Sequence, residues 1–378
     1  MTEVVGRLVL RDAVVAGRIA LDGERIASIA PDPAAEHGPL VCPGFVDVHV
    51  HGWGGHDAMG DEAALDGMAR ALLRRGVTSF LPTAVTAPLE TLVAFAERVR
   101  RWMPTVDGDR SMPLGFNSEG PCISHAKKGA QNPDYIVAPA DLAGPEAFAP
   151  MLDAMRIMTV APEEPGALDL IRWLSERGVN VSLGHSNATA QAAAEGYAAG
   201  GRTTTHLFNA MSGVDNHSPG LATVALAADE AYAELVADGF HVDRWLWPMI
   251  MRTKPADRLV LVSDAISLAG TGDGRAVLGG MEVEVRDEQC RLVSDGRLAG
   301  SVIALDSAVR NLAATGVPLP VAVAAASRNP LRLLGITDRG ELAPGQLADL
   351  VELDDDLRVR RVMRAGTWYP GPVTEVAS

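Results

Sequence analysis

Through most of this chain, short apolar runs alternate with segments of helical length that are rich in alanine. Eight of these runs have the length of a buried strand, and they begin at residues 44, 78, 112, 155, 180, 203, 233 and 258. Strands that are apolar throughout and separated by helices are typical of a parallel sheet covered on both faces. Eight strands of this kind predict an α/β fold with a (β/α)8 TIM-like barrel.

The two ends of the chain have a different pattern. Residues 1–43 alternate apolar and polar positions between turns, and residues 341–378 do so again in QLADLVELDDDLRVRRVMRAGTWY. Alternation with period two is typical of half-buried antiparallel strands. We therefore expect a small β-sandwich domain built from both chain ends, with the barrel in residues 44–340. Residues 271–293 alternate as well, and predict a hairpin inserted after the eighth strand.

Composition limits the partners that we expect. A formal net charge of −15 argues against binding to nucleic acid or to an anionic membrane, because both need a basic surface. We find neither a signal peptide nor an apolar run of about 18 residues that would span a membrane. The three cysteines form no CxxC pair, which favours a reducing compartment, and we expect a cytoplasmic protein.

Side chains that can bind a metal ion or move a proton fall where the predicted strands end. In chain order they are His49, His51, Glu119, His185, His206, His241 and Asp264. The carboxyl ends of barrel strands open onto one face, so we expect these side chains to lie close together. Within His49-Val50-His51 both imidazoles point to the same side, because side chains alternate along a strand.

Imidazole and carboxylate ligands without thiolates suit one or two divalent metal ions. Zn²⁺ is the first expectation, and Fe²⁺, Co²⁺ and Mn²⁺ are alternatives. Such an ion activates water and polarises a carbonyl oxygen, which favours hydrolysis of an amide. Asp264 is then the candidate for moving the proton. At this point the plainer interpretation also stands, in which these are ordinary polar residues on a barrel rim and Asp264 caps a helix.

The motifs PGFVDVHVHG, SEGP, LGHS, THLFNAM and VSDA, in that order, resemble the amidohydrolase superfamily, and within it the N-acetylglucosamine-6-phosphate deacetylases. The resemblance spans nearly the whole chain. It implies that Glu119, His185 and His206 bind the principal metal ion, that His49 and His51 allow a second, and that the Asp of VSDA is the catalytic acid and base. It also implies a homodimer that converts N-acetyl-D-glucosamine 6-phosphate to D-glucosamine 6-phosphate and acetate in amino-sugar catabolism.

The resemblance further implies a set of substrate-binding residues, which comprises Ala130, Gln131, Asn209, Ala210, His217, His241, Leu298, Ala299 and Gly300. The chain departs from the family pattern at His217, where the phosphate-binding Arg usually stands, and at Gln131, where some relatives have His. Replacing that Arg removes a permanently charged bidentate donor. We expect protonated His217, with Lys127 or Lys128, to meet the phosphate instead.

Three alternatives remain from the sequence. The substrate of the deacetylation could be a related or unphosphorylated N-acetyl-hexosamine. A second alternative is ring opening of a different cyclic amide, although MRIMTVAPEEP lacks the lysine that many such enzymes carboxylate after the fourth strand. The third is an inactive barrel that only binds sugars, and the retention of Asp264 beside a full ligand set argues against it.

Overall fold

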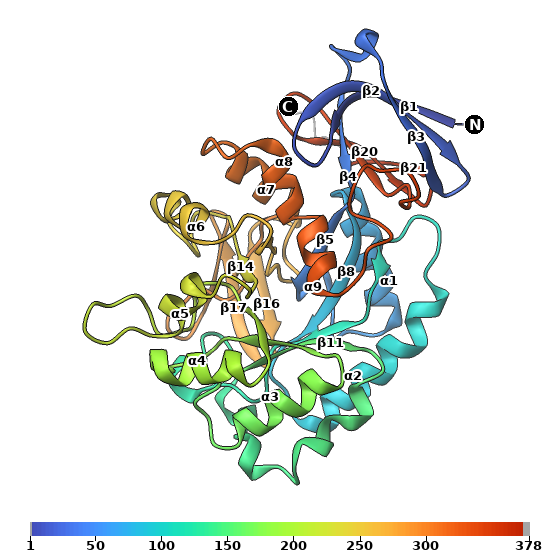
Figure 1. Ribbon diagram of the computed structural model, residues 1–378. Helices are drawn as coiled ribbons and strands as arrows, with labels where there is room; N and C mark the ends of the chain where they lie inside the picture. The colour runs from blue at the N-terminus through green and yellow to red at the C-terminus, as the bar shows by residue number, and fades with distance from the viewer. Residues whose placement is uncertain (1, 373–378) are drawn as a thin grey trace.

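The structure is a computed structural model that describes residues 2–372, and its centre is a curled sheet of parallel strands (Figure 1). In spatial order this sheet contains β5 (Phe45–Val50), β8 (Val77–Ala84), β10 (Phe116–Ser118), β11 (Met155–Val160), β12 (Asn180–Leu183) and β13 (Gly201–Thr204). The short β9 (Met112–Pro113) also pairs with β8, and β14 (Ala233–Leu235) pairs with β15 (Leu259–Leu261). Each of the eight runs overlaps at least one of these strands, and the predicted α/β fold is confirmed.

Backbone hydrogen bonds connect the β14–β15 pair to both edges of the curled sheet. On one side, Thr204 N donates to Tyr232 O at 3.1 Å, just before β14. On the other, Asp264 N donates to His49 O at 2.8 Å, just beyond the end of β15. Hydrogen bonds therefore link the eight strands in order, and the residues that follow them meet at one face.

Helices pack against the outside of the sheet. They are α1 (Glu62–Arg74), α2 (Leu89–Trp102), α3 (Ala167–Glu176), α4 (Ala190–Ala198), α5 (Leu221–Ala227), α6 (Trp247–Thr253), α7 (Leu305–Ala313), α8 (Leu319–Ala325) and α9 (Arg328–Leu333). In α1, Asp61 caps the first turn by accepting a hydrogen bond from Ala64 N at 2.9 Å. Leu65, Met68 and Leu72 of the same helix are buried in the main hydrophobic core. No helix in residues 2–372 has both the length and the apolar character that crossing a membrane requires.

The two chain ends combine in a second sheet at the top of Figure 1. Its spatial order is β21 (Thr367–Pro370), β20 (Val359–Arg364), β19 (Leu350–Leu353), β4 (Leu40–Pro43), β1 (Thr2–Val9), β2 (Val14–Asp22) and β3 (Arg25–Pro31). Leu8 and Ile19 from one end share a hydrophobic cluster with Leu350 and Met363 from the other. The sandwich arrangement and the domain limits stay predictions, and residues 373–378 of the expected C-terminal part lie outside the described residues.

The segment predicted as a hairpin after the eighth strand forms three antiparallel strands. These are β16 (Gly274–Leu278), β17 (Met281–Arg286) and β18 (Gln289–Leu292). The third strand was missed because Asp287 and Glu288, at φ 49° and 61°, make the turn that Asn-Gly usually makes. Without a glycine, the sequence gives no local signal that the chain reverses there. Leu278 of this small sheet reaches the face where the barrel strands end.

Candidate metal centre and active site

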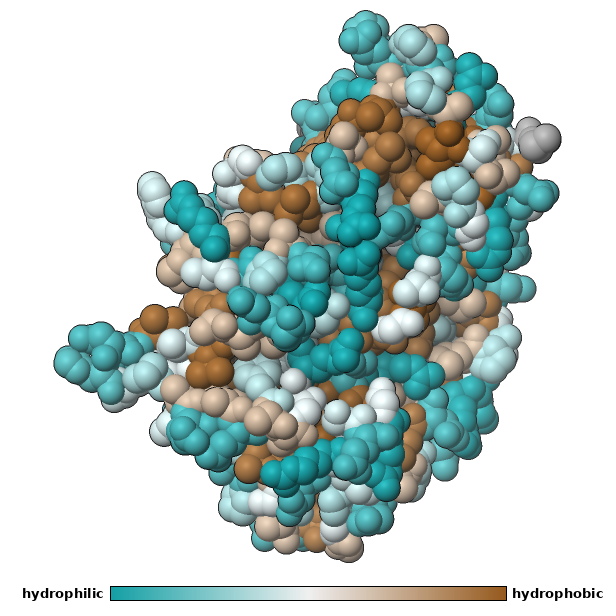
Figure 2. Space-filling model, viewed as in Figure 1, coloured by the Kyte–Doolittle hydropathy of each residue, from teal (hydrophilic) through white to brown (hydrophobic). Residues whose placement is uncertain are grey.

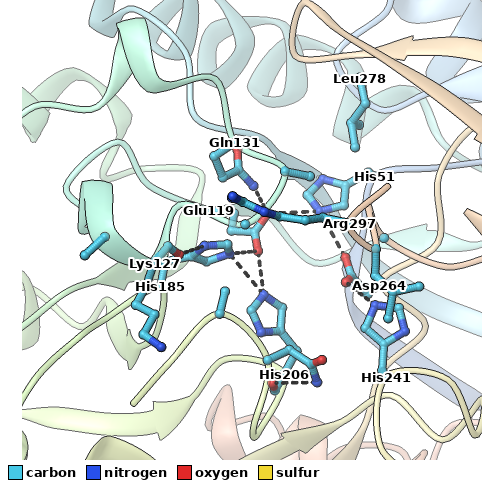
Figure 3. A pocket seen from close by; sticks show the side chains of 17 residues that line it. His51, Glu119, Lys127, Gln131, His185, His206, His241, Asp264, Leu278 and Arg297 are labelled. Carbon is cyan, nitrogen blue, oxygen red and sulfur yellow. Dashed lines mark hydrogen bonds and ion pairs between the residues drawn. The ribbon is translucent and has the colours of Figure 1, made fainter. Parts of the chain in front are cut away.

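Side chains from six strand ends point toward one another at this face (Figure 3). In one group of three, Glu119 Oε1 lies 2.9 Å from Nε2 of His185 and 2.9 Å from Nε2 of His206. The chain reaches this geometry by unusual backbone conformations, because His185 and His206 have φ values of 45° and 25°. Left-handed residues other than glycine are costly and are concentrated at functional sites.

A second group of three lies beside the first. Asp264 Oδ1 is 3.3 Å from Nε2 of His51 and 3.5 Å from Nε2 of His49. Asp264 is also left-handed, at φ 51°. Glu119 joins the two groups, since its Oε2 lies 3.2 Å from Nε2 of His51. The structure therefore places Asp264, expected as the catalytic residue, among potential metal ligands as well.

The donor atoms of both groups fit divalent cations. Nε2 of His185 lies 3.1 Å from Nε2 of His206, and Nε2 of His49 lies 3.3 Å from Nε2 of His51. The other ring nitrogens of His51 and His185 face the carbonyl oxygens of Thr83 and Lys127 at 3.1 and 3.0 Å, so Nδ1 donates in both. With Nδ1 donating, Nε2 of each ring is the atom left to bind a proton or a cation, and a shared cation would stabilise the facing nitrogens.

The electrostatics of the site also favour positive charge. Burial alone would raise the pKa of Glu119, but the neighbouring His185 and His49 hold it well below its usual range. Burial acts in the same direction on Asp264, yet the hydrogen bond from His51 and the charge of His49 lower its pKa to about 2. For His51, burial is outweighed by contacts with Asp264 and Glu119, which raise its pKa to about 9. Both carboxylates are therefore ionised at neutral pH.

A cavity of about 350 Å³ opens over the two groups, which is within the range of small-molecule sites. It is lined by most of the substrate-binding set expected from the sequence, namely Ala130, Gln131, Asn209, Ala210, His241, Leu298 and Gly300. Ala299 does not line it, because this residue is fully buried among apolar side chains of the small sheet. His217 also lies elsewhere, on the exposed loop before α5, where its ring contacts Asn216.

Gln131 and His241 are both held in fixed orientations over the site. Gln131 Oε1 accepts a hydrogen bond from Thr86 N at 2.8 Å, and its Nε2 donates to Glu119 Oε2 at 2.5 Å. His241 Nδ1 lies 2.7 Å from Asp238, and its Nε2 faces Asp264 Oδ2 at 3.8 Å. The structure places His241 in the cavity of its own chain.

Sequence analysis missed two charged residues of this region. Glu234, on β14, is fully buried behind His49. Its signal was a carboxylate among the apolar residues at the start of the run AELVADG, which we interpreted only as a strand. Arg297 lines the cavity from the segment that follows β18, and it directly precedes Leu298, Ala299 and Gly300, which the resemblance implied as substrate-binding residues.

A sequence model of the amidohydrolase family matches residues 40–369 of the chain. Among curated proteins, the chain is 37% identical to N-acetylgalactosamine-6-phosphate deacetylase of Escherichia coli O157:H7, over 90% of this chain and 91% of that protein.

Solved structures of deacetylases also align with nearly the whole chain. The chain aligns with N-acetylglucosamine-6-phosphate deacetylase of Thermotoga maritima with a TM-score of 0.90 and 31% identity, over 98% of this chain and all of that one. A mutant N-acetyl-D-glucosamine-6-phosphate deacetylase of Mycobacterium smegmatis, in complex with N-acetyl-D-glucosamine 6-phosphate, aligns with a TM-score of 0.88 and 32% identity. That alignment covers 97% of this chain and 98% of the mycobacterial chain.

Proposed function

Since the chain belongs to the amidohydrolase family, we propose that it is a metal-dependent deacetylase of N-acetyl-D-glucosamine 6-phosphate, which releases acetate and D-glucosamine 6-phosphate. One observation carries the proposal: two groups of metal-ligating side chains converge, with Asp264, at the floor of a cavity of suitable size. An inactive sugar-binding barrel would not need this set. Ring opening of a cyclic amide is disfavoured, because the relatives are named for deacetylation.

Glu119, His185 and His206 would hold the principal divalent ion, and His49 and His51 with Asp264 would hold a second. Zn²⁺ is the ion that we propose, since this donor set lacks thiolates and includes several imidazoles. When bound, the metal supplies Lewis-acid chemistry, which activates water and polarises the acetyl carbonyl. The buried donors also exclude other solvent, because each is at most 5% exposed.

Asp264 performs the proton transfers in the proposed reaction. As an ionised carboxylate it takes a proton from the attacking water and returns it to the leaving nitrogen of the sugar. His241, held by Asp238, faces the second oxygen of Asp264 and restricts its rotation. Gln131 keeps Glu119 in place by its hydrogen bond to Oε2. The site is therefore organised before substrate arrives, which favours transition-state stabilisation.

Two positively charged side chains, Lys127 and Arg297, line the cavity and are suited to bind the phosphate group. Nε of Arg297 lies 3.3 Å from Asp295, while its terminal nitrogens have no hydrogen-bond partner within residues 2–372. A guanidinium with free terminal nitrogens is a good donor to a phosphate. We propose that Arg297 and Lys127 take this role within one chain, in place of the expected His217.

A homodimer is the assembly that we propose. Around α6 the chain exposes four large apolar side chains, Phe240, Trp245, Leu246 and Met249, with Trp245 90% exposed. Such a patch is unusual on a monomer and marks an association surface. The loop that carries His217 projects near α5 in Figure 1, and its tip is hydrophilic in Figure 2.

The cytoplasmic location stays a prediction, supported by three cysteines that are all free and buried.

The test of substrate choice is acetate release from four sugars, compared by kcat/KM at matched metal content. They are N-acetylglucosamine 6-phosphate, its galactosamine epimer and the two unphosphorylated sugars. The proposal predicts the highest kcat/KM for the glucosamine phosphate. A higher value for the galactosamine phosphate would instead favour the activity for which the Escherichia coli relative is named. A preference for an unphosphorylated sugar would contradict the role of phosphate.

A further inference from the structure

A carboxylate that the proposed reaction does not use lies behind the metal centre. Glu234, on β14, is fully buried. Its Oε2 lies 3.0 Å from Nδ1 of His49 and accepts a hydrogen bond from the backbone N of His206 at 3.2 Å. Its Oε1 is buried without a hydrogen-bond partner among residues 2–372. One carboxylate oxygen therefore contacts a member of each group of ligands.

The first contact sets the tautomer of His49. Oε2 of Glu234 accepts from the backbone N of His206, so it acts as an acceptor toward His49 as well, and Nδ1 of His49 carries a hydrogen. Nε2 of His49 is then the atom left to bind a cation, and it lies 3.3 Å from Nε2 of His51 and 3.5 Å from Oδ1 of Asp264. A carboxylate behind a ligating imidazole also raises the basicity of the ring, which strengthens metal binding.

His49 differs in this respect from the other imidazoles of the two groups. Nδ1 of His51 and Nδ1 of His185 both face neutral backbone carbonyls. Nδ1 of His206 has no hydrogen-bond partner in the described part of the chain. The carboxylate of Glu234 therefore lies behind His49, one imidazole of the second group, so its effect on ligand basicity acts on that group most directly.

We propose that Glu234 is a positioning residue that makes His49, His51 and Asp264 a second divalent-cation site and fixes the backbone of His206 in the first. The inference rests on the metal centre of the proposed function and not on the substrate. It assigns a role to a side chain that contacts neither the cavity nor the reacting atoms.

Zinc stoichiometry tests this role. The wild-type protein and Glu234→Gln are stripped with a chelator and reloaded with Zn²⁺, and bound zinc per chain is measured by emission spectroscopy and by titration. We expect two ions in the wild type. In Glu234→Gln we expect one tightly bound ion, with the second held roughly 10- to 100-fold more weakly. Glu352→Gln, which alters a buried carboxylate of the chain-end sheet, is the control and should keep two.

His51→Asn is the companion variant, because it removes a ligand of the same group and leaves Glu234 intact. It should lose the same single ion even if Glu234→Gln does not fold, which far-UV circular dichroism would reveal. The inference would be overturned if a folded Glu234→Gln variant bound two ions equally tightly, or if His51→Asn did so. It would also be overturned if the wild type bound only one ion. Acetate release from the same samples separates the two proposals: a wild type with two ions and no activity would contradict only the proposed function.

Discussion

Replacing Asp264 by Asn tests the proton transfers at the centre of the proposed reaction. Asn has the same size and keeps one oxygen, so the shape of the cavity should be preserved. It cannot accept the proton of the attacking water. General acid–base catalysis contributes typically about 10²- to 10⁴-fold. Loss of this contribution corresponds to roughly 3 to 5 kcal/mol in the activation free energy.

The structure makes the direction of this effect specific. Asp264 is ionised at neutral pH, because contacts with His51 and His49 lower its pKa to about 2. The carboxylate therefore already stands in the form that accepts a proton. Its distance of 3.3 Å from Nε2 of His51 also makes it a ligand of the second group, so the variant should lose affinity for that ion. The principal ion, held by the other group, should remain.

The assay is acetate release from N-acetylglucosamine 6-phosphate at saturating zinc, with zinc content measured on the same samples. Asp273→Asn, an exposed position nine residues further along, is the matched control and should be indistinguishable from wild type. A kcat for Asp264→Asn within about 10-fold of wild type, at equal content of the principal ion, would refute the assignment, since acid–base catalysis contributes more than that.

Three further predictions concern other parts of the molecule. Burial lowers the pKa of Lys254 to about 8, so between pH 8 and 10 the unfolded chain binds more protons than the folded one. The protein's free energy of unfolding, measured in guanidinium, should therefore rise with pH across this window. An equal rise in Lys254→Met would contradict the reasoning. Arg297→Gln should raise the KM for the phosphorylated sugar roughly 10-fold or more, because a charge-assisted bond is lost, and should leave the KM for the unphosphorylated sugar unchanged. Arg286→Gln, at the end of β17, is the control, and equal KM values in both variants would exclude Arg297 from phosphate binding. Trp245→Ser should shift the protein toward monomer in analytical ultracentrifugation, and an unchanged dimer would move the interface away from α6.

The sequence was sufficient to find the eight strands and the residues at their ends. β5, β8, β11 and β15 are mainly apolar and buried, which is the pattern that a parallel sheet covered by helices needs. β10 and β13 are largely polar in sequence and were found only as parts of longer runs. His51, His185 and Asp264 stood out because polar side chains directly follow such runs, and parallel strands bring their ends to one face. The pairing of the chain ends also followed from a local pattern, the alternation of apolar and polar positions in the two terminal segments.

What the sequence did not reveal depends on contacts between distant segments. Glu234 contacts His49 across 185 positions of sequence, and its own run gave no sign of a partner. His217 was expected at the phosphate from the resemblance, and within one chain it does not line the cavity. Arg297 reaches the site only because the inserted strands fold back over the barrel, a path that the pattern of alternation does not specify.

The most direct test of metal-dependent deacetylation is acetate release from N-acetylglucosamine 6-phosphate before and after chelation. Protein loaded with Zn²⁺ should release acetate, chelated protein should lose this activity, and reloading should restore it in proportion to bound zinc. Equal release by chelated protein, or no release by fully loaded protein, would contradict the proposed function.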